Sequence, residues 1–188
     1  MAGRTRDERI DAAVLAAARQ LLDTDGYTDL SIGQVAAVAG VHRPAIYRRW
    51  PSKRHLVVDV VADLLGVTPT PDTGDLRADL TVSLRALVRA LRDTCLNRVL
   101  PALVADLADD PTLRERLLTT VFEPRRATTA AALRSAMARG EVDPDMDLDF
   151  VLDTVAAPIY FRALFGHLPL SDELADQSVD AVLRVIAR

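Results

Sequence analysis

Residues 31–55 read SIGQVAAVAGVHRPAIYRRWPSKRH, and this stretch predicts two short helices joined by a tight turn. Ser31 suits the N-cap of the first helix, because its hydroxyl can accept a hydrogen bond from a free backbone N–H. Gly40 stands where that helix must end with a positive φ, which glycine adopts without a Cβ clash. Pro44 suits the first turn of the next helix, where its missing N–H costs nothing. The stretch therefore predicts a helix–turn–helix whose second helix covers about residues 43–50.

The apolar spacing decides which side of this second helix faces the protein. Ile46 and Trp50 are four residues apart, so they are expected to point into the core. The remaining side chains are then expected to point outward, namely Arg43, Ala45, Tyr47, Arg48 and Arg49.

The charge pattern indicates what these outward residues bind. No Asp or Glu occurs from Leu30 to Val58, whereas this window holds five Lys or Arg residues and two of the three histidines. The whole chain has a formal net charge of −4. A local cationic surface on an acidic protein is typical of a site for a polyanion, and arginine can pair with guanine edges or phosphates. A solvated basic surface is the alternative, but the turn glycine, the helix lengths and the missing acids together favour DNA.

Residues 28–41, TDLSIGQVAAVAGV, and residues 46–53, IYRRWPSK, resemble the N-terminal domain of the TetR family of transcriptional repressors. The likeness covers about residues 7–65. It implies that outward residues of the second helix read bases in the major groove, and that a Tyr and a Lys bind phosphates. For this chain the resemblance implies contacts in the major groove from Arg43, Pro44, Ala45 and Arg48. It implies phosphate contacts from Tyr47 and Lys53.

Four more residues complete the candidate DNA-binding set. Thr28 lies beside the basic stretch and either contacts a phosphate or caps a helix. His42 stands where the family often has a Ser or Thr helix cap, so it could reach a phosphate instead. Ser31 and Arg49, which lie in the same acid-free window, are the other two candidates for DNA contacts. Ahead of this set, residues 1–6 are polar and form either a mobile arm that reaches a minor groove or a disordered tail.

The composition predicts an all-α protein. Hydrophobic residues make up 49% of the chain and aromatic residues only 4%, which favours packed helices over disorder. The single cysteine, Cys95, excludes an internal disulfide and lies in an apolar pattern, so we expect it to be buried. The N-terminus lacks a signal peptide, and no apolar run approaches the roughly 18 residues of a membrane span. We therefore expect a cytoplasmic protein.

Residues 67–74, VTPTPDTG, contain two prolines and a glycine and are predicted to link two domains. Residues 1–66 are the predicted helix-turn-helix DNA-binding domain, and residues 75–188 the predicted larger domain for ligand binding and dimerisation. The charge changes sign between the halves. Residues 1–60 hold nine basic and seven acidic residues, a net +2, whereas residues 61–188 hold fourteen and twenty, a net −6. This asymmetry is expected if only one end meets DNA.

Helices are also expected outside the helix-turn-helix, and prolines should interrupt two of them. Pro101 should break or kink one of them. Pro124 should kink another, because the carbonyl near residue 120 loses its partner. The kink either opens a cavity or follows the core. The expected helices are residues 7–25, 53–65, 75–100, 102–109, 112–139, 147–167 and 171–187.

The last two predicted helices are apolar on more than one face, which favours a partner surface. The TetR resemblance implies a homodimer in which these helices, about residues 147–187, form a four-helix bundle. A merely well-buried helix pair is the alternative. An effector pocket is expected among the helices 75–100, 112–139 and 147–167, with few charges on those faces and hence an apolar or aromatic effector. Its candidate lining residues are Leu84, Leu103, Leu117, Val121, Phe122, Tyr160 and Phe161.

No motif for catalysis or metal binding stands out. The chain lacks a Gly-rich phosphate loop, His-x-x-x-His, a Cys cluster and Gly-x-Ser-x-Gly, so we expect no enzyme activity, no cofactor and no metal site. The leading hypothesis is a homodimeric, ligand-responsive transcriptional repressor on a palindromic operator, released by a small apolar effector. One alternative is an all-helical small-molecule carrier or enzyme with a vestigial DNA-binding module. Another is an activator or architectural DNA binder without an effector.

Overall fold

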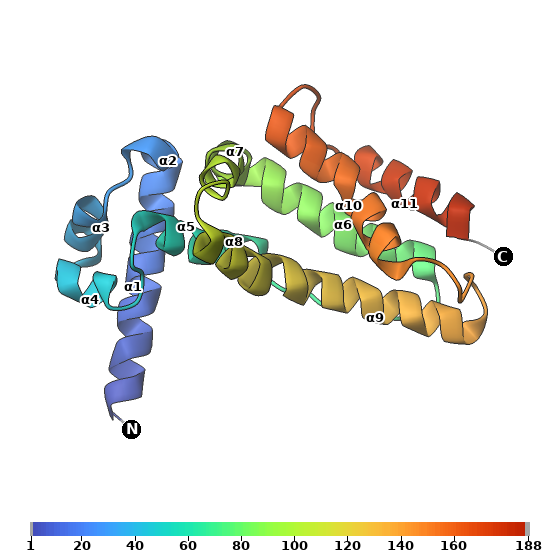
Figure 1. The fold of residues 1–188 in the computed structure, drawn as a ribbon, viewed down its shortest axis with the longest axis horizontal. Coiled ribbons are helices and arrows are strands. Elements are labelled where there is room, and N and C mark those ends of the chain that lie inside the picture. Colours follow the sequence, from blue (N-terminus) through green and yellow to red (C-terminus); the bar gives the residue numbers. More distant parts are fainter. Residues whose placement is uncertain (1, 187–188) are drawn as a thin grey trace. The chain divides into compact units, whose positions relative to one another are not determined.

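The computed structural model describes residues 2–186, with side chains from residue 8 onward. These residues form helices and no strands, which confirms the predicted all-α class. They make two compact units (Figure 1). The first contains the chain up to Leu64 together with Arg98–Val121, and the second contains Leu65–Asn97 together with the chain from Phe122 onward. Residues 98–121 thus pack with the N-terminal helices, although the sequence placed them in the second domain.

Five helices carry the N-terminal part of the first unit: α1 (Ala2–Thr24), α2 (Gly26–Asp29), α3 (Ile32–Ala39), α4 (Arg43–Tyr47) and α5 (Lys53–Leu65). Helix α3 packs against both α1 and α4. Both interpretations of the N-terminal segment, a mobile arm and a disordered tail, are wrong for residues 2–6, which are helical and belong to α1. Helix α2 is a single turn that the sequence did not predict.

The predicted turn between α3 and α4 is present. The backbone N–H of Gln34 donates to the Ser31 hydroxyl at 3.3 Å, so Ser31 caps α3 as expected. Gly40 has a φ of 66°, and the N–H of Val41 donates to the Ala36 carbonyl at 3.0 Å. This left-handed glycine ends α3 and reverses the chain into α4.

Helix α4 is shorter than predicted, since it ends at Tyr47 instead of residue 50. The N–H groups of Arg49 and Trp50 both donate to the Ile46 carbonyl at 2.9 Å, which closes a turn. Pro51 prevents the helix from continuing beyond this turn, because it disfavours helical backbone at the preceding residue, Trp50. Ile46 and Trp50 are buried as expected.

Asp59 of α5 fixes the buried indole of Trp50. Its Oδ2 accepts a hydrogen bond from the indole Nε1 at 2.8 Å and another from Nη2 of Arg116 at 2.7 Å. Nε of Arg116 donates to Oδ1 at 3.1 Å. Arg116 lies in α8 (Pro111–Leu117). One carboxylate therefore joins the end of α4 to α5 and α8 within the first unit.

The expected helix 75–100 is wrong, because the structure divides it at Thr94 into α6 (Leu76–Asp93) and α7 (Leu96–Asp106). The Thr94 hydroxyl donates to the Ala90 carbonyl at 2.7 Å and accepts from the Leu96 N–H at 3.2 Å, so it competes with helical hydrogen bonding. Pro101 lies inside α7 and does not end it. The expected short helix 102–109 is accordingly part of α7.

Helix α8 continues through a π-helical turn, Leu118–Phe122, into α9 (Glu123–Arg139). Pro124 has no N–H to offer the carbonyl four residues before it, so the irregular turn lies where the sequence predicted a kink. Gly140 then ends α9 with a φ of 77°.

The second unit is built from α6, α9, α10 (Leu148–Phe165) and α11 (Asp172–Ile186). Helix α11 packs against α6 and α10, and α9 packs against the same two helices. Arg85 binds Asp176 through two hydrogen bonds of 2.9 and 2.6 Å, which tie α6 to α11 and lower the pKa of the Asp176 carboxyl. Cys95 is buried as expected.

Residues 67–74 contain no helix, as predicted for a linker, but they are held in place. The buried carboxylate of Asp79 accepts from the N–H of Thr73 at 2.9 Å and from its hydroxyl at 2.8 Å. Among the described residues, no helix is both long and apolar enough to cross a membrane.

Replacing Asp59 with Ala should lower the free energy of unfolding by about 1–3 kcal/mol, because the buried indole N–H and the Arg116 guanidinium lose their acceptor. Urea unfolding followed by circular dichroism measures this change. Asp63→Ala is the control, because Asp63 lies one turn further along α5 and is exposed. Equal stability of the two variants would contradict a structural role for Asp59.

Candidate nucleic-acid interface

The outer surface of α4, together with the residues directly before and after it, is polar and exposed to solvent. His42, Arg43, Pro44, Tyr47 and Arg48 are exposed. Tyr47 is 52% exposed, which is unusual for a large aromatic side chain and leaves its ring and hydroxyl available to a partner. Ile46, on the opposite side of α4, is fully buried and contacts the core.

Two arginines on this surface have no carboxylate partner among the side chains that the structure describes. They are Arg43 at the start of α4 and Arg48 just after its end. The guanidinium of Arg43 lies over Gly33 of α3, where a Cβ would come within 2.6 Å of Nη2. The missing side chain at Gly33 therefore gives Arg43 its place beside α3. Both arginines keep an uncompensated charge for an anionic partner.

Arg49 behaves differently from its neighbours. It forms an ion pair with Asp11 of α1 and donates from Nη1 to the Ala45 carbonyl at 3.1 Å. Its side chain is only 15% exposed. The expectation that Arg49 points outward is therefore wrong, because the carboxylate of α1 draws it inward. In this structure it holds α4 against α1.

Lys53, at the start of α5, lies against the end of α2. Its ammonium donates to the carbonyl oxygens of Tyr27 at 3.1 Å and Thr28 at 2.8 Å. It also lies 5.3 Å from the centre of the Tyr27 ring. An ammonium has three protons, so one donor remains for a phosphate beyond these two carbonyls. Thr28 itself is exposed.

Asp106 of α7 binds two residues beside this basic surface. It accepts a hydrogen bond from the Tyr27 hydroxyl and lies 3.1 Å from Nε of Arg54. Burial, followed by this hydrogen bond to a carboxylate, raises the pKa of the Tyr27 hydroxyl. Arg54 is thus compensated by an acid, whereas Arg43 and Arg48 have none among the described side chains. No sequence pattern predicted this role of Asp106, which is distant in the chain from both of its partners.

The remaining candidates divide by exposure. Ser31 is exposed while its hydroxyl caps α3, and Ala45 is half-buried. His42 occupies the N-cap position of α4 without a side-chain hydrogen bond to the helix, so its ring is not used for capping. The predicted DNA-binding roles of all ten residues stay predictions.

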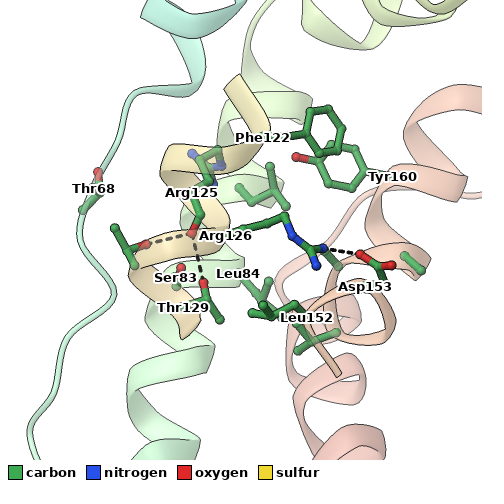
Figure 2. Close-up of a pocket in the computed structure, with 15 residues that line it drawn as sticks. Thr68, Ser83, Leu84, Phe122, Arg125, Arg126, Thr129, Leu152, Asp153 and Tyr160 are labelled. Atoms are coloured by element: carbon green, nitrogen blue, oxygen red, sulfur yellow. Dashed lines mark hydrogen bonds and ion pairs between the residues drawn. The ribbon is translucent and has the colours of Figure 1, made fainter. Parts of the chain in front are cut away.

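A second candidate site is a cavity of about 280 Å³ in the second unit (Figure 2). Its walls come mainly from α6, α9 and α10. Leu84, Phe122 and Tyr160 line it, as expected for the effector pocket. Its other lining residues are Thr68, Ser83, Leu87, Arg125, Arg126, Thr128, Thr129, Leu152, Asp153, Val155, Ala156 and Ala157.

Four residues expected in the pocket do not line this cavity. Leu103, Leu117 and Val121 are buried in the first unit, because residues 98–121 pack with the N-terminal helices. Phe161 is 54% exposed on α10. Its ring contacts the Phe165 ring, with the two centres 4.8 Å apart.

The cavity is also more charged than expected, since Arg125, Arg126 and Asp153 line it. Arg126 forms ion pairs with Asp153 and, at 2.8 Å, with Asp149. Figure 2 shows the Arg126–Asp153 pair across the opening between α9 and α10. The expectation of few charges is wrong, because Arg125 and Arg126 of α9 and Asp153 of α10 occupy positions that the apolar spacing did not include.

One end of the cavity is aromatic. The rings of Phe122 and Tyr160 are stacked with their centres 5.5 Å apart (Figure 2). Burial raises the pKa of the Tyr160 hydroxyl, and the nearby Arg125 opposes that shift. Arg125 donates from Nη1 to the carbonyl oxygens of Leu65 and Gly66, both at 2.9 Å.

Comparison with known proteins matches both parts of the chain to family models. Residues 14–60 match the model described as bacterial regulatory proteins of the tetR family, and residues 70–182 match the tetracyclin repressor-like C-terminal domain. The chain is similar to the DNA-binding transcriptional repressor TetR of Mycobacteroides abscessus, at 34% identity over 97% of this chain and 96% of the relative. It is also similar to the HTH-type transcriptional regulator AqdR of Rhodococcus erythropolis, at 26% identity over 96% and 84%.

A solved structure agrees with these matches. The TetR family transcription regulator SCO0332 superposes with a TM-score of 0.78 at 33% identity, over 95% of this chain and 99% of that one. The family models and the relatives thus agree with what the exposed helix α4 and its arginines indicate, which is binding to DNA. The chain belongs to the TetR family and is a DNA-binding transcriptional regulator.

Proposed function

We propose that the chain is a ligand-responsive repressor that binds a palindromic operator as a homodimer. A small, largely apolar or aromatic effector releases the repressor from the operator. The observation that carries DNA recognition is the exposed surface of α4, on which Arg43 and Arg48 lack a carboxylate partner among the described side chains. A relative named as a repressor supports the direction of control. A bacterial regulator that binds DNA acts in the cytoplasm, where we place this chain.

In this proposal α4 enters the major groove. Arg43 and Arg48 pair with base edges or phosphates, and Pro44 and Ala45 bring the backbone close to the bases. Tyr47 contacts a phosphate with its exposed hydroxyl. Lys53 donates to a phosphate with the one ammonium proton that is not bound to the carbonyls of Tyr27 and Thr28.

Thr28, Ser31 and His42 lie at the edge of the same surface and are proposed to contact the DNA backbone. All three are exposed. Arg49 remains a candidate only through the α4 backbone that it positions, because its side chain is held by Asp11.

The proposed dimer forms through α10 and α11, about residues 147–187. Exposed aromatic side chains on α10 support it, since Phe150, Phe161 and Phe165 are 65%, 54% and 69% exposed. Large exposed apolar surfaces typically mark contacts with a partner. A two-fold axis would place two copies of α4 in successive major grooves, roughly 34–36 Å apart.

The proposed effector site is the cavity between α6, α9 and α10. It supports a division in which residues 1–66 bind DNA and residues 75–188 bind the effector and the second copy. The effector acts only through its different affinity for the DNA-bound and released states. Its apolar body would rest against Leu84, Leu87 and the stacked rings of Phe122 and Tyr160.

Arg48→Ala should weaken binding to the DNA upstream of the chain's own gene by about 1–3 kcal/mol and reduce the salt slope by about one unit. Fluorescence anisotropy at several salt concentrations measures both quantities. Arg134→Ala is the matched control, because Arg134 is an exposed arginine of α9 outside the acid-free window. An unchanged affinity of the Arg48 variant would reject the proposed interface.

Phe161→Glu and Phe165→Glu should each turn the dimer into a monomer at micromolar concentration, because a buried carboxylate would face its own symmetry mate. Sedimentation velocity measures the state. Val82→Glu adds the same charge at an exposed apolar position of α6 and should leave the dimer intact. A dimer that persists in both Phe variants would exclude this face of α10 as the interface.

A further inference from the structure

Arg125 differs from the other arginine that lines the effector cavity. Arg126 is neutralised by Asp149 and Asp153, whereas Arg125 has no carboxylate partner among the described side chains. Its Nη1 donates to two neutral carbonyl oxygens, those of Leu65 and Gly66. Neutral acceptors satisfy hydrogen bonds but leave the positive charge uncompensated.

The surroundings make that charge costly. Arg125 is half-buried, and the cavity beside it is walled by Leu84, Leu87 and Val155. A cation next to an apolar wall is stabilised more by a carboxylate than by carbonyl groups, because the carboxylate brings a full opposite charge into a poorly solvated site. The planar guanidinium has five donors, and a carboxylate can engage two of them at once.

Hydroxyl groups line the same cavity. The Ser83 hydroxyl accepts a hydrogen bond from Thr70 at 3.2 Å, which leaves its own proton for another acceptor. Thr128 and Thr129 donate to the carbonyl of Arg125 and fix the backbone that carries the guanidinium. The cavity therefore offers donors to an acid as well as apolar surface to a ring.

We propose that the effector is an aromatic acid whose carboxylate pairs with Arg125 and whose ring packs against the apolar wall and the Phe122–Tyr160 stack. This proposal rests on the proposed function and narrows its effector from apolar to amphipathic and anionic. The cavity of about 280 Å³ is a size for one or two fused rings with one acidic group. Arg125 donates to the carbonyl of Leu65, the last residue of α5, and to that of Gly66, which follows it. A carboxylate that bound Arg125 would compete with these two hydrogen bonds at the end of α5.

Isothermal titration of the full chain with matched probes tests the proposal. The probes are benzoate, naphthoate and indole acetate, each compared with its primary amide, which keeps the ring and removes the charge. At least one acid should bind tenfold or more tightly than its amide. In Arg125→Gln this preference should fall below about threefold, whereas Arg134→Gln, with the same charge change on the exposed side of α9, should keep it.

Arg125→Lys guards against a folding defect, because it retains the charge and one carbonyl partner. It should fold and keep at least part of the preference for the acid. The proposal is overturned if no acid binds, if the amides bind as tightly as the acids, or if Arg125→Gln retains the full preference. The titration contains no DNA, so a chain that binds acids but no operator would overturn the proposed function alone.

Discussion

The hydrogen bond from the Trp50 indole to Asp59 is the constraint on which the proposed DNA-binding surface depends. Helix α4 has only five residues, too few to be stable alone, so its position comes from the core contacts of Ile46 and Trp50. Asp59 holds the indole and is itself held by Arg116. Because these contacts fix the inner side of α4, Arg43 and Arg48 are left on its outer side.

The arginines divide into two groups by their partners. Arg49, Arg85 and Arg116 bind carboxylates and join helices to one another. These pairs are partly exposed, and such pairs specify which helix faces meet more than they add stability individually. Arg43 and Arg125 have no carboxylate partner among the described side chains, and they lie at the two surfaces proposed to bind anions. The pairing pattern, more than the number of arginines, distinguishes fold-building cations from candidates for binding.

Short-range rules predicted the helix-turn-helix well. The Ser31 cap and the left-handed Gly40 depend only on neighbouring residues, so their sequence signals are sufficient. Lys53 and Gly66 likewise mark the true ends of α5. The inward turn of Arg49 was not predictable in this way, because its partner Asp11 is distant in the sequence. The break at Thr94 was missed because an apolar stripe continued across it.

The cavity proposed for the effector shows where such reasoning stops. Apolar spacing selected Leu84, Phe122 and Tyr160, and all three line the cavity. It also selected Leu103 and Leu117, which are equally apolar but pack in the other unit, and spacing carries no information about that choice. Arg125 had no signal at all, because its importance comes from the carboxylate that is missing beside it. A missing partner is a property of three-dimensional packing, so the chemistry of this pocket becomes readable only once every neighbouring acid has been placed.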